Sequence, residues 1–217
     1  VIKNGAKANQ FMVLEDYNDC YPTWELQMSS RDKQYNIDTV SDIYEINDGA
    51  RRGIHVTRTH QDSVIEQIMW FYADMPKIDF ETKVNWQQIK QILKVSFPVD
   101  INADKASYEI QFGTIERPTH FNTTWDQAKF EVCAHKYADL SDGGYGVAML
   151  NDCKYGFSTE GSTLKLTMLK CGTFDLYERR YGSKIRKMNP ESCEINDLLT
   201  CHQYDSLERR WTADDWI

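Results

Sequence analysis

The sequence predicts an all-β protein, a large antiparallel sandwich, and three features of the chain support this prediction. Apolar and polar residues alternate with a period of two, most clearly over residues 78–84 and 93–99, as expected for strands with one buried face. Short clusters of turn-forming residues separate such runs. The runs recur roughly every 10–15 residues with no helical pattern between them, which is typical of a sandwich.

The predicted strands follow one another along the chain. In order, the runs cover residues 54–58, 64–72, 78–84, 93–99, 108–112 and 164–168. In run 78–84 we expect Ile78 and the other even-numbered residues to face a core. In run 93–99 the odd-numbered residues are expected to face a core and Lys94 to face water. Pro98 marks a sheet edge or a strand end, because proline has no backbone N–H to donate.

Turn signals lie between these runs. They are Asn47-Asp48-Gly49, Asn102-Ala103-Asp104, Asp142-Gly143-Gly144 and Thr159-Glu160-Gly161. Each contains residues that tolerate a positive φ, so each predicts a tight connection between strands. The His60-Gln61-Asp62 triplet falls between two runs and is expected to form a hairpin tip.

The pattern changes after residue 172. Five basic residues fall within positions 179–187, and the alternation is absent after Pro190. Ile195, Leu198 and Leu199 fit one or two helical turns. We therefore divide the chain into a β-sandwich domain of residues 1–172 and a divergent tail of residues 173–217, which is irregular, partly helical or disordered.

The composition argues against two classes of partner. The chain of 217 residues carries 25 Lys and Arg against 33 Asp and Glu, a net charge of −8. This charge is unfavourable for binding nucleic acid or an anionic membrane surface. No apolar run approaches the ~18 residues of a membrane span.

The six cysteines lie at positions 20, 133, 153, 171, 193 and 201, with no Cys-x-x-Cys pair. A chain of this length does not need disulfides for stability, so we expect reduced thiols and a cytoplasmic protein. Cys133 and Cys153 lie in or beside strand-like runs, and we expect both to be buried in the sheets. A metal site at Cys133, His135 and Cys153 is disfavoured, because a small buried thiol and a hydrogen-bonded histidine explain these residues as well.

The richest group of functional side chains lies in residues 115–126, where a loop is expected after a strand. The candidate site residues are Glu116, Arg117, His120, Asn122, Trp125 and Asp126. A sugar site needs carboxylates and planar polar groups for hydroxyls, and an aromatic face for the apolar side of the ring. A structural alternative stays open, in which Arg117 pairs with Glu116 or Asp126 and Trp125 belongs to the core.

Residues 111–156 also carry a family resemblance. The motifs, in order, are Gln111-Phe112-Gly113, Glu116-Arg117-Pro118-Thr119-His120, Asn122-Thr123, Trp125-Asp126, Phe130-Glu131-Val132, His135, Asp139-Leu140, Gly144-Tyr145-Gly146-Val147-Ala148 and Leu150-Asn151-Asp152-Cys153-Lys154-Tyr155-Gly156. This closely resembles the C-terminal β-domain of glycoside hydrolase family 38 α-mannosidases of the cytosolic and vacuolar type. The resemblance covers about residues 1–170, and the tail departs from it.

The resemblance implies an antiparallel β-supersandwich similar to the galactose-mutarotase-like fold. It also implies a retaining α-mannosidase whose zinc ion and nucleophile lie in an N-terminal catalytic domain outside this chain. We therefore expect the chain to be a fragment without catalytic residues, metal ligands or cofactor of its own, and inactive in isolation. His60-Gln61-Asp62 is not continued by the Trp of the family's zinc motif, so the zinc site is not assigned to it. In the intact enzyme, the partners would be an α-mannoside or oligosaccharide and the N-terminal domain, with the loop at residues 116–126 at the active-site rim.

Two other classes of function stay open. One is an independent carbohydrate-binding sandwich without hydrolase activity, for which an exposed aromatic platform would be evidence. The other is a purely structural module, for which a large exposed apolar face would be evidence.

Overall fold

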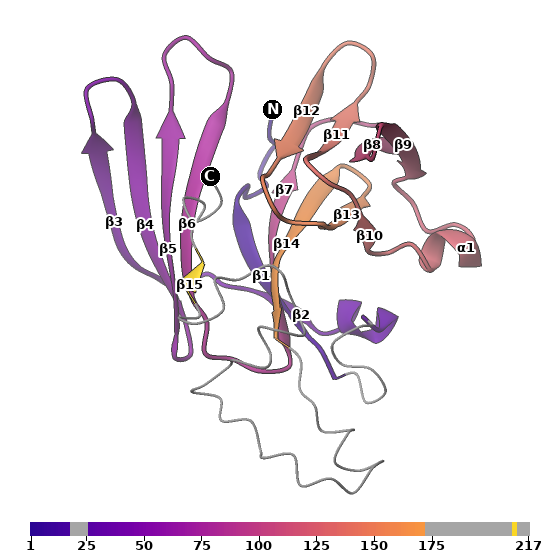
Figure 1. Cartoon of the computed structure of the whole chain (residues 1–217), viewed down its shortest axis with the longest axis horizontal. Coiled ribbons are helices and arrows are strands. Elements are labelled where there is room, and N and C mark those ends of the chain that lie inside the picture. The colour runs from indigo at the N-terminus through magenta and orange to yellow at the C-terminus, as the bar shows by residue number, and fades with distance from the viewer. Residues whose placement is uncertain (18–25, 172–209, 212–217) are drawn as a thin grey trace, which may run out of the picture. The chain divides into compact units, whose positions relative to one another are not determined.

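The structure is a computed structural model that describes residues 1–17, 26–171 and 210–211, and the described residues are mostly antiparallel strands (Figure 1). The strands are β1 (Gln10–Glu15), β2 (Gln34–Asn36), β3 (Val40–Asn47), β4 (Arg52–His60), β5 (Ser63–Phe71), β6 (Ile78–Asn85), β7 (Gln91–Pro98), β8 (Lys105–Ile110), β9 (Gly113–Pro118), β10 (Val132–Cys133), β11 (Tyr137–Ser141), β12 (Gly146–Leu150), β13 (Gly156–Glu160), β14 (Thr163–Cys171) and β15 (Arg210–Trp211). The helices of this described part are a 3-10 turn, η1 (Met28–Arg31), and a single α-helical turn, α1 (Thr124–Gln127). Neither is long enough to span a membrane. The all-β prediction is confirmed.

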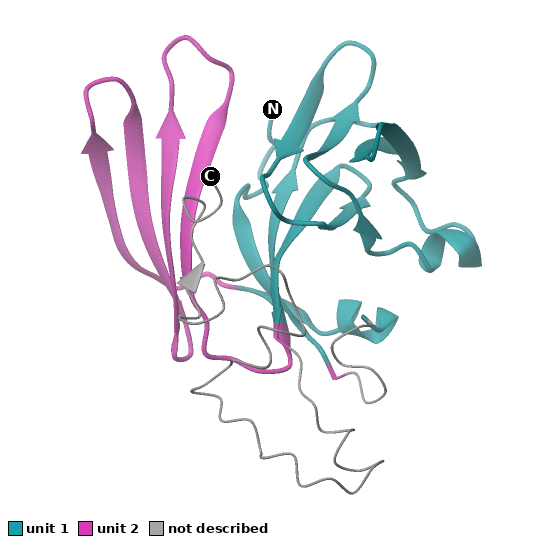
Figure 2. Ribbon diagram, in the orientation of Figure 1, with its two compact units in different colours: residues 1–16, 26–36, 92–170 teal, residues 17–25, 37–91, 171–217 magenta. Residues whose placement is uncertain are grey.

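The described residues form two compact units, the first made of residues 1–16, 26–36 and 92–170 and the second mainly of residues 37–91 (Figure 2). The first unit contains a six-stranded sheet in the order β10-β13-β14-β7-β1-β2 and a four-stranded sheet in the order β12-β11-β8-β9. Tyr108 of β8 joins the two sheets, since its hydroxyl donates to Thr159 Oγ1 of β13 at 2.7 Å. The Tyr108 ring also meets Phe157 edge-on. The first unit is therefore a sandwich with a core between its sheets.

The second unit is built from consecutive hairpins. Strands β3, β4, β5 and β6 pair antiparallel in chain order, and β4 and β5 keep a continuous register from Arg52–Phe71 to His60–Ser63. Gly49 connects β3 to β4 with φ of 88°. Gln61 connects β4 to β5 with φ of 51°, so the predicted hairpin tip at residues 60–62 is confirmed.

Several predicted side-chain orientations need correction. Lys94 was expected to face water but is only 2% exposed, because β7 lies inside the six-stranded sheet with both faces covered. Ile78 begins β6 and Phe112 lies in the β8–β9 turn with φ of 61°, and both are exposed. Pro98 is the last residue of β7, as the strand-end alternative predicts.

The prediction that Cys133 and Cys153 are both buried is correct for only one of them. Cys153 is buried and free, as predicted, whereas Cys133 is free but exposed. The exposure of Cys133 follows from its position, because β10 is a two-residue strand at the edge of its sheet. Cys20, Cys193 and Cys201 lie outside the described residues, as does the predicted tail apart from the backbone of β15, which pairs with β6.

Candidate functional site

The structure separates the six candidate residues into two groups. Glu116 and Arg117 lie on β9 and not in a loop. Strand β9 is the edge strand of its sheet, so Pro118 at its end removes no donor that a neighbouring strand would need. The remaining candidates, His120, Asn122, Trp125 and Asp126, lie in or next to α1 (Thr124–Gln127).

Glu116 and Arg117 point to opposite faces of β9. Glu116 is exposed and pairs with Lys105 of β8 at 2.8 Å, and this contact raises the pKa of Lys105. Arg117 is half-buried opposite the buried Ala106, and its guanidinium lies 4.9 Å from the centre of the Tyr108 ring. Arg117 Nη1 is buried without a hydrogen-bond partner. The structural alternative, in which Arg117 pairs with Glu116 or Asp126, is therefore not observed.

Asp126 organises the short helix. Its carboxylate accepts from the Thr123 hydroxyl at 2.7 Å and from the Thr123 N–H at 3.1 Å, while its own N–H donates to Thr123 Oγ1. This reciprocal capping box fixes the turn, and the Thr123 hydroxyl is the main cause of the lowered pKa of Asp126. The His120 ring, 43% exposed, lies 3.8 Å from the same carboxylate.

Trp125 is strongly exposed, with 79% of its surface accessible. It is therefore not a core residue, which was the structural alternative. Asn122, three residues earlier in the chain, is also exposed. The segment presents an indole, an amide and an imidazole to solvent within six residues, a set suited to contacting a sugar ring and its hydroxyls.

Both ends of this segment are fixed to the first unit, and we call residues 120–130 the α1 loop. At its start, buried Thr119 donates its N–H to Asp104 O and its hydroxyl to Ala103 O, and its carbonyl accepts from Gly161 N. At its end, Glu131 Oε2 accepts from Lys94 Nζ at 2.5 Å and Glu131 Oε1 from the Thr167 hydroxyl.

The buried ammonium at this point was not predicted. Burial lowers the pKa of Lys94, although the carboxylate of Glu131 opposes the shift. Glu131 lies 37 residues from Lys94 and 36 from Thr167 along the chain. No local pattern in the sequence signals the cluster, because its members meet only when β7, β14 and the end of the α1 loop come together.

A shallow pocket lies above the cluster, lined by Lys94, Glu131, Phe121, Arg31, Glu160 and Lys165 among others. The Arg31 guanidinium stacks on Phe121 at 4.2 Å and pairs with Glu160 at 3.0 Å. Lys165 pairs with the same carboxylate at 3.4 Å. Each cation of the lining has a carboxylate partner, but Arg31 and Lys165 share Glu160, so these five groups keep a net charge of +1. The contacts hold the α1 loop against the sheet.

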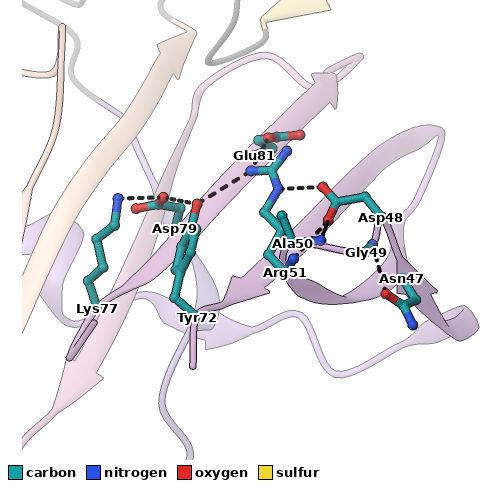
Figure 3. Close-up of polar contacts among 9 residues, drawn as sticks. All are labelled: Asn47, Asp48, Gly49, Ala50, Arg51, Tyr72, Lys77, Asp79 and Glu81. Carbon is teal, nitrogen blue, oxygen red and sulfur yellow. Dashed lines mark hydrogen bonds and ion pairs between the residues drawn. The ribbon is translucent and has the colours of Figure 1, made fainter. Parts of the chain in front are cut away.

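A second polar cluster, also missed from the sequence, lies at one end of the second unit (Figure 3). Arg51 donates to Asp48 at 2.8 Å and to Tyr72 at 3.4 Å and lies 3.6 Å from Glu81. Tyr72 and Lys77 both donate to Asp79. Partial burial alone would raise the pKa of Asp79, but these two hydrogen bonds outweigh it and lower the pKa. Every charge in this cluster has a partner, which favours a structural role at the hairpin end.

A zinc site in a protein needs three or four His, Cys, Asp or Glu ligands close together. Within the part of the chain that the structure describes, no three His, Cys, Asp or Glu side chains lie close enough to hold a metal ion. These described residues therefore do not form a zinc site of their own. His135 instead packs edge-on against Tyr155.

Comparison with known proteins gives consistent matches. The family model for the glycosyl hydrolases family 38 C-terminal domain matches residues 1–178. Alpha-mannosidase 2C1 of Homo sapiens is 36% identical over 178 residues, which make up 78% of this chain and 16% of the human protein. The alpha-mannosidase of Saccharomyces cerevisiae is 40% identical over 178 residues, 77% of this chain and 16% of the yeast protein.

The fold is also found in solved structures. The crystal structure of an alpha-mannosidase from Enterococcus faecalis V583 matches with a TM-score of 0.64 at 15% identity, covering 77% of this chain and 23% of that one. At this identity the match concerns the fold alone. The chain spans about a sixth of the length of the curated relatives.

Proposed function

The chain belongs to glycosyl hydrolase family 38, and residues 1–178 correspond to the C-terminal domain of that family. From this premise we propose that the chain forms one wall of the mannose site in a retaining α-mannosidase. Retaining hydrolysis needs two carboxyl groups about 5 Å apart around the scissile bond. We assign these groups, and the zinc ion of the intact enzyme, to the N-terminal catalytic domain. This chain then binds and orients the sugar and supports that domain.

The observation that carries the proposal is the exposure of Trp125, within six residues of the chain that also expose His120 and Asn122. An indole face packs against the apolar face of a pyranose, while an amide and an imidazole hydrogen-bond to hydroxyls. Asp126 holds the turn through its capping box and lies next to His120. Glu116 is accessible on one face of β9, whereas Arg117 lies on the opposite face and its Nη1 is a buried donor without a hydrogen-bond partner.

The test is a Trp125→Ala substitution in the enzyme that contains this chain, assayed with an aryl α-mannoside. Loss of a stacking contact that is equal in ground and transition states raises KM and leaves kcat unchanged. We expect KM to rise about tenfold, the effect of losing roughly 1.4 kcal/mol of binding energy. The control is Phe112→Ala, because Phe112 is an aromatic residue in the β8–β9 turn that is even more exposed than Trp125. Equal kinetics for wild type and Trp125→Ala would overturn the rim assignment.

A second function is an independent carbohydrate-binding module, which the exposure of Trp125 also favours. Saturable binding of mannose oligosaccharides by the 217-residue chain alone, lost on Trp125→Ala, would support this function. Absence of binding to the isolated chain would leave the wall of the mannose site as the remaining proposal.

We also propose that the protein acts in the cytoplasm, in the breakdown of oligosaccharides. The free thiols of Cys133 and Cys153 suit a reducing compartment.

A further inference from the structure

We propose that Lys94, Glu131 and Thr167 are positioning residues that clamp the end of the α1 loop to the six-stranded sheet and thereby fix Trp125 in its sugar-binding position. The clamp itself is independent of any activity. Its consequence for a substrate rests on the proposed function of the α1 loop.

The geometry of the clamp uses every polar group in it. Glu131 Oε2 accepts from Lys94 Nζ, and Glu131 Oε1 accepts from the Thr167 hydroxyl. Lys94 donates a further hydrogen bond to Thr167 Oγ1 at 3.0 Å. Lys94 and Thr167 lie on β7 and β14, which are neighbours in the sheet. The carboxylate of Glu131, the residue that follows the α1 loop, therefore bridges two adjacent strands.

The surroundings are shaped to admit this carboxylate. A Cβ atom on Gly156 of β13 would lie 3.1 Å from Glu131 Oε1 and 3.0 Å from the Thr167 Cβ. Both distances are shorter than ordinary van der Waals contact. The absence of a side chain at Gly156 therefore leaves room for Glu131 to reach the sheet.

The other attachments of the loop explain why the clamp matters. Thr119 holds the start with three hydrogen bonds. After Glu131 the chain enters β10, which pairs with β13 through only two residues. Residues 122–125 and 127–129 of the loop are exposed, and Phe121 and Phe130 contribute its partly buried contacts. Without the clamp, the nearest attachments after this eleven-residue segment would be the two paired residues of β10 and the N–H groups of Ala134 and His135, which donate to Tyr155 O and Glu109 O.

The choice of an ionic clamp has a physical reason. A buried ion pair adds little net stability over apolar residues of the same volume, because its desolvation is costly. Charged hydrogen bonds instead add geometric specificity, because their donors and acceptors must align. Removing one partner, however, leaves a buried charge without compensation. The cluster therefore favours one position of the loop over alternatives.

The first experiment measures loop opening in the 217-residue chain. Lys129 is exposed within the α1 loop, and trypsin cleavage after it reports the open population of the loop. We expect Glu131→Gln and Thr167→Val to increase this cleavage rate at least about tenfold, because each removes a hydrogen bond to a charged group. Gly156→Ala should act in the same direction.

The matched control is Thr163→Val, at another threonine of β14 outside the cluster. It should leave the cleavage rate unchanged. If Glu131→Gln unfolds the chain, Thr167→Val provides the answer, since it removes only a hydroxyl group. Unchanged cleavage after Lys129 in a folded Thr167→Val variant would overturn the clamp.

The second experiment separates the clamp from the proposed function. In the enzyme that contains this chain, Thr167→Val should raise the KM for an aryl α-mannoside in the same direction as Trp125→Ala, without changing kcat. Unchanged KM for both variants contradicts the proposed function. A raised KM for Trp125→Ala with wild-type KM for a loop-opened Thr167→Val contradicts the positioning role alone.

Discussion

The guanidinium of Arg51 lies over the indole ring of Trp70, 3.8 Å from its centroid. Trp70 is 5% exposed, and its other ring atoms leave almost no space beside Gly53. A Cβ at Gly53 would lie 2.8 Å from two carbons of the ring. In the second unit, the Trp70 ring is thus packed between the guanidinium of Arg51 and the backbone of Gly53.

This packing predicts the effect of adding one methyl group. Gly53→Ala should destabilise the protein by about 1–3 kcal/mol, because the buried ring has to shift and the Arg51 contact shifts with it. Urea unfolding measures the loss. The control is Gly113→Ala, where nothing lies within 4 Å of the added atom. Equal unfolding midpoints for the two variants would contradict the description of Trp70.

A buried carboxylate predicts a pH dependence. Asp16 is 1% exposed and lies 3.3 Å from Lys170. Burial raises its pKa, and Lys170 opposes the shift only in part. Between the unfolded value of 3.8 and the higher folded-state pKa, the folded protein binds more protons than the unfolded chain. Stability is therefore lost as the pH rises through this window.

Asp16→Asn should accordingly stabilise the protein at neutral pH. The gain should shrink as the pH falls through the folded-state pKa towards 3.8, where Asp16 is protonated in both states. Unfolding free energies of wild type and variant at several pH values measure the difference. A gain that does not vary with pH would show that charge burial is not its cause.

The thiols predict a difference in reactivity. Cys133 is exposed, whereas Cys153 is buried and its pKa is raised mainly by that burial. A maleimide should therefore label Cys133 in the native protein and Cys153 only after unfolding, because the thiolate is the reactive form. Mass spectrometry of the labelled peptides distinguishes the two sites. Native labelling of Cys153 at the rate of Cys133 is the contrary result.

The proposed assignment of the zinc ion and the catalytic carboxyl groups to an N-terminal domain predicts the behaviour of the isolated chain. It should neither hydrolyse an aryl α-mannoside nor retain one zinc ion per chain after dialysis. Both properties are assigned to the N-terminal catalytic domain. Stoichiometric zinc together with turnover by this chain alone would place the catalytic groups here instead.

The candidate site could be predicted only in part from the sequence. The density of polar and aromatic residues near Trp125 indicated an exposed functional segment, and Trp125 is indeed exposed. The prediction of a loop at Glu116 and Arg117 was wrong, because both residues belong to β9. A proline is compatible with an edge strand, and the sequence does not show which strands lie at an edge. The contact between Arg117 and Tyr108 could not be predicted from the sequence either, because it depends on the register that places Tyr108 opposite Ile115, two residues before Arg117.

What the sequence by itself determined is the local pattern: alternating runs became strands, and residues such as Gly49 and Gln61 became hairpin turns. These features depend on neighbours along the chain, so a linear pattern contains them. Only the tertiary structure decided that Lys94 is buried against Glu131, that Cys133 is exposed, and that Arg51 covers Trp70. A period of two assigns a side chain to a face, but which faces are covered depends on sheet order and on segments far away in the sequence.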